Sequence, residues 1–480
     1  MNLNIKFGTD GWRDIIADDF TFKNVSIVSR AIGEFITHNY EKTLPLYIGY
    51  DSRFLSKEFA NFAANELIKL GIKVLLSDSV VPTPVVAYHA FKNKSAGAIQ
   101  FTASHNPPKY CGLKYITNYG GPAPEKITDE ITKLINDCRD APAGRLYNGQ
   151  IIPLFNPRTE YFRHMGTLID FQKIKNAKLK IIYDPLFGAG LNYLDHLIKE
   201  AGCEIYTIHN RHDPLFGGLL PEPREENLND LKEAIISKQA TIGLATDGDA
   251  DRLGIMDEKG IFYSPNKIAS MLVRHLIKNK KLTGNVVRTL STTHLVDHLA
   301  KKYNLKVIET KVGFKWIAEE MLKTQVLIGL EESGGISILN HIPDKDAILA
   351  GMLITEMVAY ENKPLNEIYL ETLKDAEWKC INDRFDLYLD EKEKNSLIEY
   401  LQSKKINEIN GLKVISVNTQ EGAKYLFEDG SWFFARSSGT EPMARVYFEA
   451  TSDKILESMK HKLKEIITGL TQNSKQWLVP

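Results

Sequence analysis

The chain has 480 residues and a formal net charge of −1, with 43% hydrophobic and 25% charged residues. This near-neutral balance gives no electrostatic reason to expect binding to nucleic acid or to an anionic membrane surface. The composition is that of a soluble globular protein. The length exceeds what one hydrophobic core supports, so we expect roughly three domains.

The cysteines and the first residues indicate the compartment. The four cysteines are scattered without a CxxC spacing, and we expect reduced thiols in a cytoplasmic protein. The segment 1–6 lacks an apolar signal core, and no stretch reaches the roughly 18 apolar residues of a membrane span. Neither a membrane nor a nucleic acid is therefore an expected partner.

In chain order, a glycine-punctuated loop over residues 7–13 ends in Arg13, and a helical pattern follows over residues 20–40. A strand–helix–strand unit then occurs three times. Its copies cover residues 45–76, 179–207 and 285–308. Alternating strands and helices favour parallel sheets covered by helices. Each copy leads into another helix and one more apolar strand, at residues 97–101, 242–245 and 326–330.

A polar loop follows each of these three apolar strands. The loops are residues 102–106, 247–252 and 331–335. Ligands of open α/β sheets bind outside the carboxyl ends of strands, so three related sheets predict one shared cleft. Beyond Leu373 the pattern changes to alternating strands with a closing amphipathic helix over residues 454–470.

The sequence therefore predicts an α/β protein in which three related mixed α/β sheet domains and a C-terminal α+β domain surround one central cleft. Proline-rich breaks agree with the first two domain boundaries, and the change of pattern beyond Leu373 gives the third. The predicted domains are residues 1–150, 151–262, 263–373 and 374–480.

The first polar loop, residues 102–107, presents the Ser104 hydroxyl beside the imidazole of His105. Pro107 cannot donate to a β-ladder and disfavours helix at the residue before it, so the strand ends here. A serine hydroxyl is a weak nucleophile that needs a base, and both His105 and Lys114 are candidates. We expect cations around the lysine to lower its pKa. Alone, these residues also fit an Asn-Pro turn with a capping serine.

The second polar loop places three carboxylates, those of Asp247, Asp249 and Asp251, at alternate positions. Carboxylate oxygens ligate hard cations, and we expect these three to repel one another without a cation. A calcium hand is excluded, because Arg252 stands where such a loop needs glycine, and strands instead of helices flank it. A solvated acidic turn is the alternative, and a Mg²⁺ site shared with a phosphate oxygen fits better.

The third polar loop combines Glu331, Glu332 and Ser333. Adjacent carboxylates can accept hydrogen bonds from neighbouring sugar hydroxyls, although a charged turn explains the loop equally well. Two nearby segments supply further polar or cationic groups, among them Thr310, Gly313 and Lys345.

A fourth motif, residues 436–440, links two strands of the last domain. Its guanidinium, hydroxyls and free N–H groups around a glycine are the parts of a phosphate-binding loop. A plain hairpin loop explains the serines and the glycine, but it does not explain Arg436 at the start and Arg445 soon after.

These four motifs, in this order and at domain-sized spacing, resemble those of the α-D-phosphohexomutases, the phosphoglucomutase and phosphomannomutase superfamily. The resemblance covers the whole chain, from residues 8–13 to the last domain. It implies an intramolecular phosphotransferase of the isomerase class. Such an enzyme moves a phosphoryl group between O1 and O6 of an aldohexose phosphate through a hexose 1,6-bisphosphate, which is also the activator.

By this resemblance Ser104 is the phosphorylated residue, and it holds one Mg²⁺ together with Asp247, Asp249 and Asp251. Lys114 matches the general acid/base, with His105 as its rival, and Arg13 is a further catalytic residue. The implied substrate-binding residues are Arg252, Thr310, Gly313, Glu331, Ser333, Lys345, Arg436, Ser437, Ser438, Gly439, Thr440 and Arg445.

The residues at 331–333 and 341–346 look more like those of glucose-preferring members than of phosphoglucosamine mutases, and mannose phosphates remain open as substrates. Two alternatives stay: a sugar-bisphosphate synthase with the same phosphoserine, and a non-catalytic scaffold derived from a mutase. The expected partners are small sugar phosphates, and the protein is expected to be a monomer or a homodimer.

Overall fold

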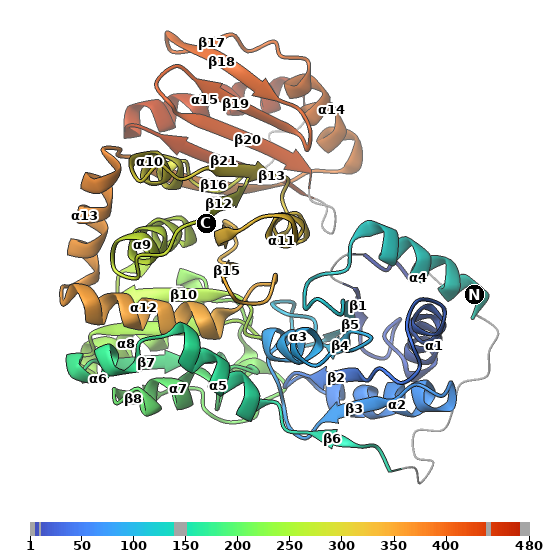
Figure 1. Cartoon of the computed structure of the whole chain (residues 1–480). Helices are drawn as coiled ribbons and strands as arrows, with labels where there is room; N and C mark the ends of the chain where they lie inside the picture. Colours follow the sequence, from blue (N-terminus) through green and yellow to red (C-terminus); the bar gives the residue numbers. More distant parts are fainter. Residues whose placement is uncertain (1–4, 9–10, 139–150, 438–442, 471–480) are drawn as a thin grey trace.

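The computed structural model describes residues 5–8, 11–138, 151–437 and 443–470. Four sheets follow one another along the chain. In Figure 1 the first domain (blue) and the second (green) form the lower part, the third lies above the second, and the fourth (orange to red) lies at the top. Within the described ranges, no helix has the length and apolar character needed to cross a bilayer.

The first sheet has the strand order β1-β5-β4-β2-β3-β6. Its strands are β1 (Trp12–Ile15), β2 (Leu46–Tyr50), β3 (Val74–Ser77), β4 (Ala98–Phe101), β5 (Tyr110–Ile116) and β6 (Leu154–Phe155). Its helices are α1 (Phe22–Asn39), α2 (Ser56–Lys69), α3 (Thr83–Lys92) and α4 (Glu125–Asp137). Arg13, expected at the end of a loop, instead lies in the edge strand β1 and pairs with Gly112 of β5.

The second sheet has the order β11-β10-β9-β7-β8 and the third the order β13-β12-β14-β15. The second domain contains α5 (Arg158–Leu168), α6 (Phe171–Ala177), β7 (Lys180–Asp184), α7 (Leu194–Glu200), β8 (Glu204–Thr207), α8 (Asn229–Lys238), β9 (Ile242–Thr246), β10 (Leu253–Asp257) and β11 (Phe262–Tyr263). The third contains α9 (Pro265–Lys278), β12 (Asn285–Thr289), α10 (Leu295–Lys302), β13 (Val307–Thr310), α11 (Phe314–Lys323), β14 (Val326–Leu330), β15 (Ile336–Ile338), α12 (Ala347–Glu361) and α13 (Leu365–Ala376).

The predicted threefold repeat is confirmed, and the structure adds one strand to each copy. Three parallel strands are followed by an antiparallel strand that forms a hairpin with the third of them. These hairpins are β4–β5, β9–β10 and β14–β15. The three polar loops are the turns of the three hairpins, so equivalent places in three related sheets carry the unusual residues.

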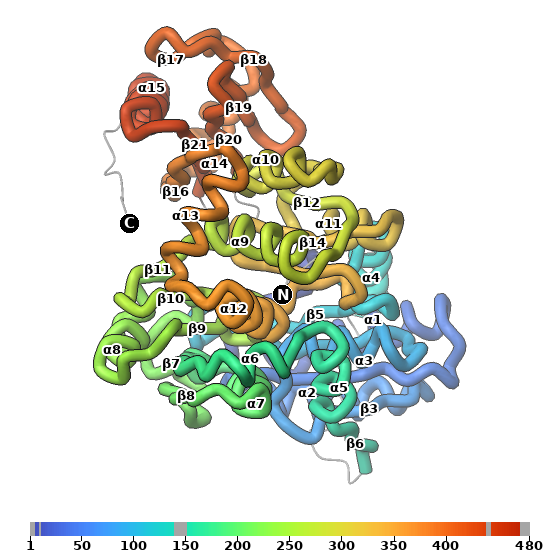
Figure 2. The backbone as a smooth tube through the Cα atoms, turned by 60° about the vertical axis from the view of Figure 1, so that its left-hand side comes forward, coloured from blue at the N-terminus to red at the C-terminus, as the bar shows by residue number. Residues whose placement is uncertain are grey.

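Helix α12 joins the second and third domains. It is apolar around most of its circumference, and all residues from Ala347 to Ala359 are buried, as expected for a helix enclosed on all sides. A Cβ atom added at Gly351 would lie 2.7 Å from Leu194 of α7, so glycine permits this close approach. Figure 2 shows α12 close to α6 and α7 of the second domain.

The fourth domain is an antiparallel sheet with the predicted closing helix and a second helix, Glu391–Gln402, that was not predicted. Its order is β16-β21-β20-β19-β18-β17. The elements are β16 (Ile381–Tyr388), α14 (Glu391–Gln402), β17 (Glu408–Ile409), β18 (Leu412–Asn418), β19 (Ala423–Phe427), β20 (Trp432–Ser437), β21 (Met443–Ala450) and α15 (Asp453–Leu470). Side chains alternate along β20, so Phe433 packs with α14 and α15 while Trp432 packs against Leu290 of the third domain.

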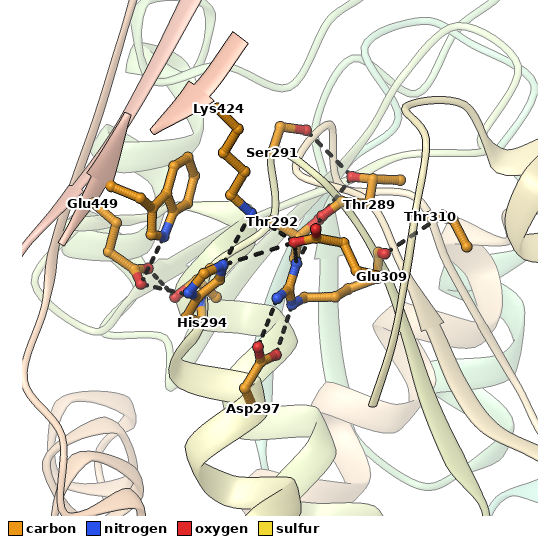
Figure 3. A network of polar contacts seen from close by, with 12 residues as sticks. Thr289, Ser291, Thr292, His294, Asp297, Glu309, Thr310, Lys424 and Glu449 are labelled. Atoms are coloured by element: carbon orange, nitrogen blue, oxygen red, sulfur yellow. Dashed lines mark hydrogen bonds and ion pairs between the residues drawn. The ribbon is translucent and has the colours of Figure 1, made fainter. Parts of the chain in front are cut away.

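A buried polar network joins the third and fourth domains (Figure 3). Lys424 of β19 donates to Glu309 at 2.7 Å and contacts His294 Nε2 at 2.9 Å. Arg288 donates to the same glutamate at 2.6 Å. Burial, and then the charge of Arg288, lower the pKa of Lys424 to about 8. The fourth domain is therefore attached through paired charges as well as through apolar packing.

Candidate active site

Ser104 lies in the hairpin turn after β4, where the predicted strand end places it. It is 1% exposed and adopts a left-handed backbone conformation with φ 51°. Its Oγ atom donates to Oδ2 of Asp247 at 3.0 Å and lies 3.5 Å from Nδ1 of His105. The first two polar loops therefore meet at the serine hydroxyl.

The three aspartates of the second loop form a compact oxygen cluster. One carboxylate oxygen from each of Asp247, Asp249 and Asp251 lies within 4.8 Å of the others. Oδ1 of Asp249 and Oδ1 of Asp251 are buried without a hydrogen-bond partner among the described residues. Buried carboxylate oxygens are costly when unsatisfied, and oxygen ligands suit Mg²⁺, so this donor set fits a divalent cation.

Lys114, on β5, is paired with these carboxylates. Its Nζ atom lies 2.7 Å from Oδ2 of Asp249 and 3.7 Å from Oδ2 of Asp251. Burial alone lowers the pKa of Lys114, but the two carboxylates outweigh it, so the pKa lies above its ordinary value. Arg13 and Lys345 act to lower this pKa, as expected, but the nearer aspartates outweigh them, so the expected net lowering is wrong.

The expected repulsion among the aspartates is unevenly distributed. Burial, followed by the charges of Asp251 and Asp249, raises the pKa of Asp247 well above its ordinary value. For Asp249, burial acts in the same direction, but Lys114 and a 2.6 Å hydrogen bond from Thr83 outweigh it and lower the pKa. The cluster therefore contains one stabilised carboxylate and one whose charge is disfavoured.

The other two residues expected near the serine also lie there. His105 has a pKa well below its ordinary value, first through burial and then through the charges of Arg252 and Arg13, so its imidazole is neutral. Arg13 donates to the side chain of Asn106 at 2.9 Å, within the serine loop. Arg252 lies 3.7 Å from Glu222 and 3.8 Å from Asp251.

Lys345 lies between β15 and α12 and packs beside Gly335 of the third loop, and its Nζ atom lies 3.4 Å from Oδ2 of Asp251. Glu331 accepts hydrogen bonds from the backbone N–H of Gly313 at 3.1 Å and from Ser333 at 3.3 Å. Thr310 ends β13, and its hydroxyl donates to the carbonyl of Lys311 at 3.1 Å. The Glu331 carboxylate thus accepts one hydrogen bond from its own loop and one from the residue before α11.

The motif of the fourth domain lies only partly within the described residues. Arg436 and Ser437 end β20, and Arg436 stands opposite Arg445 of β21. Ser438, Gly439 and Thr440 lie outside the described residues. Arg445 Nε is 4.0 Å from Oδ1 of Asp386.

Two residues near the site were missed by the sequence analysis. Thr83, at the start of α3, donates to Asp249. Arg384 of β16 lies 3.6 Å from Glu332 and donates to Asp386 through Nη2 at 2.9 Å, so it links the third polar loop to the fourth domain. Neither has a local signal, because each acts on a residue far away in the sequence.

Comparison with family models matches the four domains in turn. The α/β/α domains I, II and III of phosphoglucomutase/phosphomannomutase match residues 4–141, 159–260 and 264–375. The C-terminal domain of the same proteins matches residues 390–466.

Individual relatives span nearly the whole chain. A phosphoglucosamine/phosphogalactosamine mutase of Sulfurisphaera tokodaii is 29% identical over 96% of this chain and 99% of its own length. A phosphoglucomutase/phosphomannomutase of Thermococcus kodakarensis is 28% identical over 93% and 95%. The crystal structure of a candidate phosphomannomutase from Thermus thermophilus is 30% identical, with a TM-score of 0.85 over 97% of this chain and 99% of that one.

Proposed function

The chain belongs to the phosphoglucomutase/phosphomannomutase family of phosphohexomutases, and we propose that it interconverts glucose 1-phosphate and glucose 6-phosphate through a phosphorylated Ser104. The observation that carries this proposal is the meeting of three elements: a buried serine hydroxyl 3.0 Å from Asp247, a compact aspartate cluster, and a lysine ion-paired to that cluster. These are the groups that phosphoryl transfer needs for positioning and for charge neutralisation.

In the proposed reaction, the phosphoryl group leaves Ser104 Oγ for the free hydroxyl of the sugar phosphate. The bond between phosphorus and Oγ breaks, a bond between phosphorus and the sugar oxygen forms, the hydroxyl proton passes to a base, and the leaving Oγ takes up a proton to become the serine hydroxyl. The product is a hexose 1,6-bisphosphate. Return of its other phosphoryl group to Ser104 by the reverse step releases the isomeric monophosphate and regenerates the phosphoserine.

Two side chains compete for the role of the base. The imidazole of His105 is neutral and lies 3.5 Å from the serine oxygen. Lys114 matches the family's acid/base position, and its pairing with Asp249 keeps it protonated. Lys114 therefore suits proton donation, or charge neutralisation of the transferring group, in the arrangement described.

Asp247, Asp249 and Asp251 would hold a Mg²⁺ ion together with the phosphoserine. A bound Mg²⁺ supplies neutralisation of the negative charge on the transferring phosphoryl group. The two unsatisfied carboxylate oxygens of Asp249 and Asp251 support this assignment.

The preference for a neutral sugar rests on the third loop. Glu332 faces the guanidinium of Arg384, which balances its charge, and Glu331 accepts hydrogen bonds from Gly313 and Ser333. A cationic 2-amino sugar gains most from an uncompensated carboxylate, whereas a 2-hydroxyl group needs only hydrogen bonds. This arrangement supports glucose phosphates as substrates, with mannose phosphates as further ones.

A second candidate substrate is glucosamine phosphate, because relatives at 28–29% identity are phosphoglucosamine mutases. Steady-state rates with glucose 1-phosphate, mannose 1-phosphate and glucosamine 1-phosphate test the preference directly. We expect the highest kcat/KM for glucose 1-phosphate, by on the order of 10-fold or more over the mannose compound. A higher kcat/KM for the amino sugar would contradict the glucose assignment and leave the mutase family unaffected.

Peptide mass spectrometry of the purified protein tests the phosphoserine itself. Phosphate is expected on Ser104, and the Ser104→Ala variant is expected to be inactive while still binding substrate. Accumulation of bisphosphate in the presence of an outside phosphoryl donor, with no isomerisation, would instead indicate a sugar-bisphosphate synthase.

A further inference from the structure

Arg53 lies directly behind the serine loop and is fully enclosed. It follows β2, and its side chain is 0% exposed. The guanidinium carbon lies 4.9 Å from the ring centre of Phe216, a residue of the second domain. No part of the Arg53 side chain therefore has access to a substrate in the cleft, so it can act on the reaction only through its neighbours.

The guanidinium donates hydrogen bonds to backbone carbonyls of the serine loop. Nη2 donates to the carbonyl oxygens of Ser104 at 2.6 Å and Asn106 at 2.7 Å. Nη1 donates to those of Pro107 at 2.9 Å and Tyr110 at 3.0 Å. Four carbonyls from one turn thus converge on one side chain.

The remaining donor, Nε, faces Oδ2 of Asp51 at 3.2 Å, and the other oxygen of that carboxylate accepts the backbone N–H of Arg53 at 3.0 Å. Arginine has five N–H donors in a rigid planar fork, and here the two Nη atoms make four hydrogen bonds to carbonyls while Nε is only ion-paired with Asp51. Lysine keeps the charge but has only three donors at a single nitrogen, so it cannot reproduce the set.

The serine at the centre of this loop has a conformation that L-residues rarely adopt, with φ 51°. Its carbonyl is fixed on Arg53, and its N–H donates to the Thr102 hydroxyl at 2.8 Å. With both backbone groups of Ser104 held, its side chain projects to Asp247. Gly248 closes the other side, since a Cβ there would lie 2.5 Å from the Ser104 carbonyl oxygen.

We propose that Arg53 is a positioning residue for phosphoryl transfer: it holds the left-handed turn that aims Ser104 Oγ at the aspartate cluster. This inference rests on the proposed role of Ser104. The consequence is a specific kinetic pattern. Loosening the turn misplaces the phosphoryl group without changing the groups that bind the sugar, so kcat falls while KM changes little.

The test compares Arg53→Lys with a matched buried arginine far from the loop. Arg274 of α9 is 1% exposed and ion-paired with Glu361, Glu371 and Asp375, so Arg274→Lys also disrupts a buried guanidinium. The readouts are kcat and KM for glucose 1-phosphate, the thermal midpoint, and amide hydrogen exchange of the peptide covering residues 103–110.

Arg53→Lys is expected to lower kcat by about 10- to 100-fold, to leave KM within about 2-fold, and to accelerate exchange in the loop peptide. Arg274→Lys is expected to lower the thermal midpoint while keeping kcat and loop exchange unchanged. The proposal is overturned if Arg53→Lys behaves like Arg274→Lys in both kcat and loop exchange.

If Arg53→Lys does not fold, Asp51→Asn serves instead, because it removes only the charge that orients Nε. The same fall in kcat and faster loop exchange are expected, and unchanged values would overturn the proposal. Failure of the proposed function is distinguishable, since it appears as wild-type protein without mutase activity or phosphate on Ser104, whereas loop exchange reports on Arg53 in either case.

Discussion

The ammonium group of Lys114 lies 2.7 Å from Oδ2 of Asp249, which makes Asp249 different from its neighbour Asp247. Asp249 also accepts from Thr83, and its pKa is lowered. Asp247 accepts from the Ser104 hydroxyl and two backbone N–H groups, and its pKa is raised. The Asp247 and Asp249 carboxylates, both members of one proposed metal site, are therefore expected to contribute differently to the free energy of unfolding.

The first prediction follows from this difference. Asp249→Asn is expected to abolish turnover and to destabilise the protein by about 3 kcal/mol, because it removes the nearer of the two carboxylates paired with the buried ammonium group of Lys114. Asp247→Asn is expected to abolish turnover with no loss of stability, since it removes a disfavoured charge. Urea unfolding with a metal chelator present measures the stability of both variants. Equal destabilisation by the two would contradict the different charge states inferred for Asp247 and Asp249.

The second prediction concerns the proton-transfer group. Lys114→Gln is expected to lower kcat by about 10²- to 10⁴-fold, whereas His105→Gln is expected to cost about 10-fold or less. The reason is that Lys114 is held among the carboxylates, while the contact of His105 with Ser104 Oγ is long, at 3.5 Å. Steady-state kinetics of both variants measures these effects, and the opposite order would make His105, not Lys114, the more important group for proton transfer.

The positions of the three polar loops could be predicted from the sequence because each loop directly follows a strand, and strand ends can be located from local patterns. The sequence could not locate partners that tertiary packing supplies. Lys114 was expected among cations, but the pairing of β4 with β5 carries it to the aspartates. Arg384 was unremarked, because its contact with Glu332 depends on how the fourth domain lies against the third.

The third prediction uses that contact between Arg384 and Glu332. Arg384→Gln leaves the Glu332 carboxylate uncompensated by this guanidinium, so a 2-amino sugar gains a favourable charge interaction. We expect the ratio of kcat/KM for glucosamine 1-phosphate to that for glucose 1-phosphate to rise about 2- to 10-fold. Arg384→Lys, which keeps the positive charge, is the control and is expected to leave the ratio near that of the wild type. An unchanged ratio in Arg384→Gln would show that Glu332 does not sense the sugar's second position.

The fourth prediction concerns acid stability and a chain of imidazoles near Lys345. His164 Nε2 lies 3.0 Å from Nδ1 of His341, whose Nε2 lies 2.8 Å from Asp346. When Nε2 of His341 donates to the aspartate, its Nδ1 accepts from the N–H of His164. Burial, and then His341, lower the pKa of His164 to about 4 from its ordinary 6.5.

Because the folded pKa of His164 lies below the unfolded value, the unfolded chain binds the proton first as the pH falls. Its contribution to stability is therefore intact above pH 6.5 and is lost as the pH falls toward about 4. We expect a loss of about 2 kcal/mol between pH 7 and pH 5 from this group. His164→Gln keeps a donor for His341 but does not titrate, so its unfolding free energy should fall less over the same range. If the unfolding free energies of the wild type and of His164→Gln fell equally over this pH range, the acid sensitivity would come from groups other than His164.

The last prediction concerns how one serine serves both ends of a sugar. The phosphoryl group leaves Ser104 for one hydroxyl of the sugar and is recovered from the other. The bisphosphate must therefore reverse its orientation in the site between the two steps. The proposed phosphate-binding residue Arg436 then holds first one phosphate and afterwards the other.

Arg436→Ala is therefore expected to raise KM for glucose 1-phosphate and glucose 6-phosphate alike, by about 10- to 100-fold, because a charge-assisted hydrogen bond to phosphate is lost from either bound form. Arg211→Ala, at a side chain that is 75% exposed in the second domain, is the matched control and should change neither KM. Steady-state kinetics in both directions measures the effect. A higher KM for only one of the two substrates would mean that each phosphate has its own binding site. The proposal that the bisphosphate reorients over a shared Arg436 would then be wrong.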